Sequence, residues 1–135
     1  MMNVFLGKWQ LVESENFDAY MKEVGVGLIT RKAANTLKPL MEVTVNNNVW
    51  KFHSTTAMKT HTMEFELGKE TDTVTADGRK MKSVFDIDGD KLVQTETKIT
   101  KNDKDSVITR HVDGNKLIAV MKSGDVEAKR IYEKQ

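Results

Sequence analysis

The 135-residue chain is 39% hydrophobic and 30% charged, and its formal net charge is only +1. This composition is typical of a soluble globular protein, and the balanced charge gives no support for nucleic-acid binding. The chain has no cysteine, which excludes disulfides and thiolate metal sites, and no apolar run long enough for a membrane helix. We therefore expect one cytoplasmic domain spanning residues 1–135.

The N-terminal part predicts a strand followed by two short helices. Side chains alternate over residues 5–14 (FLGKWQLVES), as in a strand. The period then changes to that of one helix face, carried by Phe17, Tyr20, Met21 and Val24. Asn16 is the expected N-cap, and Gly25 ends this helix. Residues 28–39 predict a second helix that Pro39 closes, so a helical segment covers about residues 16–37.

After Pro39 the sequence predicts a series of consecutive strands. Runs rich in strand-forming residues alternate with turn sequences such as DGR, DGD, DGN and SGD. Together they indicate about ten antiparallel strands. Such strands must close into a barrel or pack as two layers to protect their edges. A barrel with a ligand cavity and the helices over its open end fits this pattern, and so does a sandwich with a helical cap.

Two arginines are predicted to face inward. In the last strand Arg130 and Tyr132 share a face, while the opposite face is mostly charged. Arg110 likewise shares its face of the strand with the apolar residues Ile108 and Val112. A guanidinium keeps its charge, so a buried pair requires an anion such as a ligand carboxylate. Taken alone, each arginine is more typical of a surface residue or an internal salt bridge. Apolar inward residues would suit an alkyl chain: Phe17, Met21, Phe52, Ala119 and Met121.

The sequence resembles the intracellular lipid-binding proteins, the cytosolic fatty-acid-binding proteins. The resemblance rests on GKWQLVESENFDAYMKEV near the N-terminus, GVGLITRKAANTLKP after it, TADGRKMKS, and the closing KRIYEK. It implies an all-β fold: a ten-stranded antiparallel up-and-down β-barrel, or β-clam, with a helix-turn-helix lid over an internal ligand cavity. It also implies a non-enzymatic carrier that binds long-chain fatty acids, such as oleate or palmitate, without a cofactor or metal.

The family's site residues carry over by position. The carboxylate-binding group falls on Arg110, Arg130 and Tyr132. Cavity and portal positions fall on Phe17, Tyr20, Met21, Val26, Thr30, Ala34, Pro39, Ser54, Thr56, Ala76, Asp77, Arg79, Ala119 and Met121. Met58 stands where many members have a portal phenylalanine. Phe52 and Trp50 face inward by alternation, and Trp50 is larger than the family's usual residue there. The connection KITKNDKDS is longer than usual and predicts only a solvated charged loop.

The remaining residues bear on partners and rival functions. The resemblance implies transfer to anionic membranes through basic lid residues, and in some relatives a nuclear-import surface and a nuclear receptor, with Lys22, Arg31 and Lys32 as candidates. A carrier of another acidic lipid, similar to retinoic acid, that shuttles to the nucleus is the alternative. An enzyme is disfavoured because His53, His61 and His111 lack metal-ligand spacing and are expected at the surface. We expect a monomer.

Overall fold

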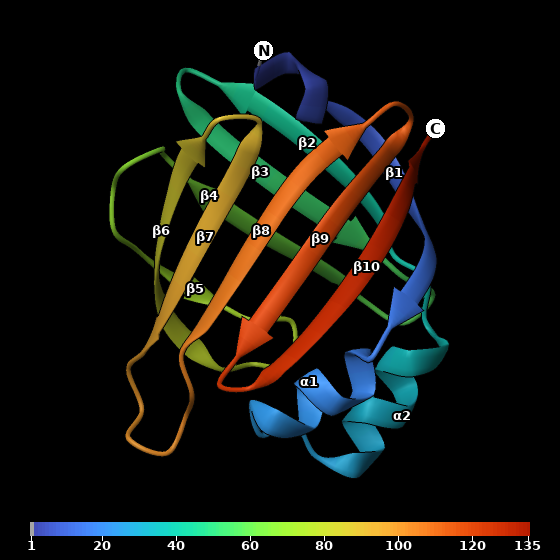
Figure 1. The fold of residues 1–135 in the computed structure, drawn as a ribbon, viewed down its shortest axis with the longest axis vertical. Coiled ribbons are helices and arrows are strands. Elements are labelled where there is room, and N and C mark those ends of the chain that lie inside the picture. The colour runs from blue at the N-terminus through green and yellow to red at the C-terminus, as the bar shows by residue number, and fades with distance from the viewer. Residues whose placement is uncertain (1) are drawn as a thin grey trace.

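The computed structural model of the protein describes residues 2–135 and consists of ten strands and two α-helices (Figure 1). A short 3-10 helix, η1 (Met2–Phe5), comes first. The α-helices are α1 (Phe17–Glu23) and α2 (Leu28–Thr36). The strands are β1 (Gly7–Glu15), β2 (Leu40–Asn46), β3 (Val49–Thr55), β4 (Thr60–Phe65), β5 (Thr71–Val74), β6 (Lys80–Asp88), β7 (Lys91–Lys98), β8 (Ser106–Asp113), β9 (Lys116–Ser123) and β10 (Val126–Lys134).

The strands form one antiparallel sheet that curls into a nearly closed barrel. Their order is β4-β3-β2-β1-β10-β9-β8-β7-β6-β5, so strands that are consecutive in sequence pair, except β4 with β5, and β1 also pairs with β10. The edge strands β4 and β5 share no backbone ladder. The predicted fold class, a ten-stranded antiparallel barrel with a helical lid, is confirmed, and the sandwich alternative is wrong.

The helices lie over one end of the barrel, and both chain ends lie at the other (Figure 1). Asn16 is the N-cap residue of α1, as predicted, but its backbone is left-handed, with φ of 60°, and its side chain makes no capping hydrogen bond. Instead its Nδ2 donates to the carbonyl of Glu127 at 2.9 Å. Asn tolerates this conformation better than most residues, so the start of α1 is tied directly to β10. Within residues 2–135, no helix has the length and apolar character needed to cross a membrane.

Aromatic packing closes the end of the barrel away from the lid. The rings of Phe65 and Phe85 stack with centroids 3.5 Å apart, and Phe52 meets both edge-on. Phe85 is completely buried. This cluster also holds Phe5, Trp9, Met41, Val43, Trp50, Leu92 and Leu117. A second cluster lies under the lid and holds Tyr20, Met21, Val24, Val26, Ala119, Met121 and Ala128. The space between the two clusters is where a cavity can form.

We expect Phe85→Ala to lower the free energy of unfolding by about 3–5 kcal/mol, because it removes a fully buried ring and leaves a hole beside Phe52 and Phe65. Urea denaturation followed by intrinsic fluorescence measures the loss. Val107→Ala on β8 is the matched control, since that side chain is 41% exposed and should cost about 0.5 kcal/mol or less. A Phe85→Ala loss as small as that of the control would contradict the role given to this cluster.

Candidate ligand cavity

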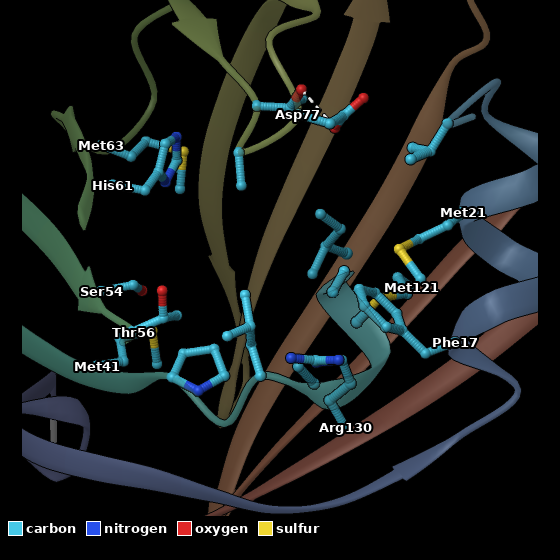
Figure 2. Close-up of a pocket in the computed structure, with 18 of the residues that line it drawn as sticks. Phe17, Met21, Met41, Ser54, Thr56, His61, Met63, Asp77, Met121 and Arg130 are labelled. Carbon is cyan, nitrogen blue, oxygen red and sulfur yellow. Dashed lines mark hydrogen bonds between the residues drawn. The ribbon is translucent and has the colours of Figure 1, made fainter. Parts of the chain in front are cut away.

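A cavity of about 510 Å³ lies between the aromatic cluster and the lid. Its walls are mostly apolar and come from the lid and from strands all around the barrel. In Figure 2, Arg130 lies beside Phe17, while Met41, Ser54 and Met63 occupy the opposite wall. A volume of this size is in the range of pockets that hold small molecules.

Strand register places the two predicted arginines in one row. Arg110 of β8 pairs with Ala119 of β9, and Ala119 in turn pairs with Arg130 of β10. Neighbouring strands are about 4.8 Å apart, so the two arginine backbones lie roughly 10 Å from each other. The small side chain between them leaves open space in front of both guanidinium groups. Tyr132 follows Arg130 on the same face of β10 and also lines the cavity.

Neither arginine forms an ion pair within the described residues. The Arg130 guanidinium lies over the Phe17 ring, 3.8 Å from its centroid, and the residue is 7% exposed. The Arg110 guanidinium lies 4.9 Å from the Phe52 centroid, and its Nη1 donates to Gln94 Oε1 at 2.9 Å. Burial lowers the pKa of Arg110 from its ordinary value. Ring faces and one amide hold the two cations in place, but no carboxylate neutralises them.

Asp77 and Arg79 form an ion pair at the mouth of the cavity. Arg79 Nε and Nη2 donate to the two carboxylate oxygens of Asp77 at 2.8 and 3.1 Å. Burial opposes ionisation of Asp77, but the hydrogen bonds from Arg79 and Thr75 outweigh it and hold the pKa of Asp77 below its ordinary value. The pair therefore stays charged. Both of its side chains line the cavity at its opening.

The gap between β4 and β5 is bridged near this mouth by side chains. His61 Nε2 contacts the carbonyl of Val74 at 2.7 Å, and Lys59 Nζ donates to the carbonyl of Ala76. All three histidines, expected at the surface, are half-buried, and the ring of His61 also lines the cavity (Figure 2). It fills a position where the two edge strands do not pair, a feature that no local sequence pattern marks.

The three basic lid residues do not form one surface. Lys22 and Lys32 are exposed, as expected. Arg31 is not available in the same way: its Nε pairs with Asp18 at 3.2 Å, its Nη1 donates to the carbonyl of Val26 at 2.7 Å, and its side chain is 13% exposed. Arg31 therefore joins α2 to α1. Of the three basic residues, only Lys22 and Lys32 can contribute to an exposed basic surface.

With one exception, the structure places every residue predicted for the cavity, the portal and the carboxylate group on the cavity wall: Phe17, Tyr20, Met21, Val26, Thr30, Ala34, Pro39, Phe52, Ser54, Thr56, Met58, Ala76, Asp77, Arg79, Arg110, Ala119, Met121, Arg130 and Tyr132. Their contact with a ligand stays a prediction. The exception is Trp50, which points inward but packs between Phe5 and Phe65 at the closed end, below the cavity. Trp50 lies two residues before Phe52 on β3, which places it nearer the closed end of the barrel than the cavity.

Sequence reasoning missed a group of buried polar residues on the wall. Gln94 and Glu96 are 1% and 5% exposed, and Gln94 Nε2 donates to Glu96 Oε2 at 3.2 Å. Thr73 and Ser83 share a hydrogen bond of 2.8 Å beside them. Alternation along KLVQTETK would have placed both β7 residues with Leu92 on the inward face. Burial raises the pKa of Glu96, which makes this carboxyl group easier to keep neutral than an exposed one.

Comparison with known proteins places the fold and this cavity in one family. The profile of the lipocalin / cytosolic fatty-acid binding protein family matches residues 6–135. The chain belongs to this family. It is 46% identical over 135 residues to fatty acid-binding protein homolog 6 of Caenorhabditis elegans, and the alignment covers both chains completely. The family resemblance expected from the sequence is confirmed.

Two solved structures of family members are closely similar. Apo lipid binding protein 8 of Caenorhabditis elegans superposes with a TM-score of 0.96 at 32% identity, covering 100% of this chain and 98% of that one. A fatty acid binding protein of Schistosoma mansoni in complex with arachidonic acid gives a TM-score of 0.92 at 37% identity, covering 99% and 98%. The family consists of lipid-binding carriers, so the prediction that the chain is not an enzyme is confirmed.

We expect Glu96→Gln to stabilise the protein at neutral pH and to have less effect in acid. Because burial raises the pKa of Glu96 above its unfolded value of 4.5, the native state binds more protons than the unfolded state between these two values. The free energy of unfolding therefore falls as pH rises through that window, and the glutamine variant lacks this loss. Melting temperatures at about pH 7 and about pH 4 test the difference.

Glu64→Gln on β4 is the matched control, because that side chain is exposed. It should show no such dependence on pH. A Glu96→Gln variant that melts below the wild type at neutral pH would show that the carboxylate is stabilised there, contrary to this expectation.

Proposed function

We propose that the protein is an intracellular carrier that binds one long-chain fatty acid in the cavity and releases it through the opening beneath the lid. The observation that carries this proposal is the row formed by Arg110 and Arg130, two buried cations without a carboxylate partner in the described residues. The Schistosoma mansoni relative, whose structure contains arachidonic acid, supports the same ligand class.

The chemistry of the site favours an acid with a long apolar tail. Two guanidinium groups on the same row repel one another, and a carboxylate between them would remove both the repulsion and the missing counter-charge. Tyr132 adds a neutral donor on the same face. The apolar wall beyond the arginines would hold the alkyl chain, and each methylene buried there is worth about 0.8 kcal/mol. Neither half of the site alone would select a fatty acid from other acids or other lipids.

We expect Arg130→Gln to weaken oleate binding by about 1–3 kcal/mol, the scale for losing a charged hydrogen bond. A fatty alcohol of equal length should lose less, because its head group carries no charge to pair. Isothermal titration calorimetry with both ligands measures the two losses. Lys129→Gln is the control, since it removes a cation from the outward face of the same strand, where Lys129 pairs with Glu15. Equal losses for acid and alcohol would argue against head-group pairing.

We further propose that the lid docks on anionic membranes during transfer. Ile29 and Leu28 of α2 are 86% and 57% exposed, and Met58 at the cavity mouth is 72% exposed. The lid also carries exposed lysines, Lys22 on α1 and Lys32 on α2. Apolar side chains between lysines are the usual elements of a surface that binds an anionic interface. Among the rival roles, a nuclear-import surface is less supported, because Arg31 is engaged inside the lid.

Charge reversal at Lys22 and Lys32 should slow transfer of a fluorescent fatty acid to anionic vesicles while leaving its equilibrium affinity unchanged. The wild-type rate should also fall as salt rises, because exposed charges are screened. A Lys51→Glu, Lys91→Glu double variant has the same change in net charge on exposed residues outside the lid and serves as control. Identical transfer rates in both double variants would remove the membrane role from the lid.

A further inference from the structure

Glu96 lies one amide group away from the head-group arginine of β8. Arg110 Nη1 donates to Gln94 Oε1 at 2.9 Å, and Gln94 Nε2 donates to Glu96 Oε2 at 3.2 Å. An arginine can only donate hydrogen bonds, so the contact with Arg110 fixes which way the amide points. The two ends of one amide therefore contact a guanidinium group and a carboxyl group. This bridge holds the charge of Glu96 close to the place where we propose that a ligand carboxylate binds.

The carboxyl group of Glu96 is in a poor environment for a negative charge. The residue is 5% exposed and lines the cavity. Its carboxyl group forms no ion pair within the described residues, and the hydrogen bond to its Oε2 comes from a neutral amide. Because a carboxylate without a paired cation is costly to bury, the pKa of Glu96 is raised from its ordinary value. Glu96 therefore changes its protonation state nearer to neutral pH than an exposed glutamate does.

The charged groups near Glu96 come from three other parts of the fold. Asp77 and Arg79, between β5 and β6, pair with each other and act on Glu96 with opposite signs. Tyr20 of α1 stays neutral, because burial raises its pKa. Arg110 of β8 is then a nearby cation with no carboxylate of its own in direct contact within residues 2–135. The other charged or titratable residues on the cavity wall are Lys59, His61, Arg130 and Tyr132.

We propose that Glu96 takes up a proton from the solvent when a fatty acid binds, so that the ligand carboxylate replaces Glu96 as the nearby counter-charge of Arg110. In the empty cavity, the charge of Arg110 favours the ionised form of Glu96. A ligand carboxylate on Arg110 cancels that effect and adds a second negative charge nearby, which favours the protonated form. This inference rests on the proposed carrier function, because it requires the ligand carboxylate at the arginine row.

Proton uptake gives the affinity a pH dependence of defined sign. Where Glu96 is neutral in both the free and the bound protein, the affinity is high and constant. Where Glu96 is ionised when the cavity is empty but protonated when it is occupied, the affinity falls as pH rises. We expect a total fall of about ten-fold, at the lower end of the effect that a nearby charge has on a carboxyl group. A fall of this size corresponds to uptake of about half a proton at the middle of the window.

Isothermal titration calorimetry counts these protons when each titration is repeated in two buffers with different heats of ionisation. We would titrate the wild-type protein with oleate from about pH 5.5 to about pH 8.5, and we expect uptake to reach about half a proton within this range. A wild-type protein that binds no oleate would refute the carrier function itself. Oleate binding without proton uptake anywhere in the range would overturn this inference alone.

A fatty alcohol of equal length tests whether the charge of the ligand drives the uptake. It fills the same cavity but brings no negative charge to Arg110, so it should take up fewer protons than oleate. Equal uptake by the acid and the alcohol would overturn the exchange of counter-charges, because filling the cavity would then be sufficient.

Substitution of Glu96 assigns the proton to its carboxyl group. Glu96→Gln is neutral at every pH, so it should lose the uptake and bind oleate about ten-fold more tightly than the wild type at the alkaline end of the range. Glu64→Gln on β4 removes an exposed carboxylate and should behave as the wild type. Ionisation of the free ligand is the same in all titrations and cancels in the comparison. Uptake that survives Glu96→Gln would belong to another group, such as His61, and would overturn the assignment.

Discussion

Uncompensated positive charge inside an apolar cavity is the constraint on which the site depends. Arginine cannot lose its proton to escape burial, so Arg110 and Arg130 must be held by other means while the cavity is empty. The faces of Phe52 and Phe17 and the amide of Gln94 do this. These contacts orient the guanidinium groups without neutralising them. A protein carboxylate in direct contact with the two guanidinium groups would neutralise them, but it would also compete with an acidic ligand.

The lid is attached unevenly. On the side of β8, Tyr20 donates to Ser106 at 2.8 Å, and Lys104 in the connection before β8 pairs with Glu23 of α1 at 3.1 Å. On the side of β4 and β5, side chains such as His61 reach single carbonyls in place of a backbone ladder. Contacts of this kind break more easily than paired strands. The contacts therefore hold the structure more firmly beside α1 than at the β4–β5 gap.

Side-chain alternation predicted much of the site because strands have a strict period of two. It predicted that Arg130 and Arg110 face inward before any contact was known. The family resemblance predicted a barrel, in which inward-facing residues line a cavity. It could not tell depth. Trp50 has the correct face but lies in the closed end, since depth depends on how far the register carries each pair along the barrel. Contacts between distant segments were likewise invisible, as with Lys104, which was expected only in a solvated loop.

Buried polar residues explain why the prediction stopped short at β7. The polar composition of a run such as QTET is typical of a solvent-facing stretch, although alternation with Leu92 places Gln94 and Glu96 on the inward face, where the structure buries them. Purely apolar side chains at these two positions would leave Arg110 without its hydrogen bond to Gln94. They would also make this part of the cavity wall entirely apolar. The polar pair instead gives Arg110 a hydrogen bond and places a carboxyl group on the cavity wall. The same two residues therefore fix the position of Arg110 and make the wall beside it polar.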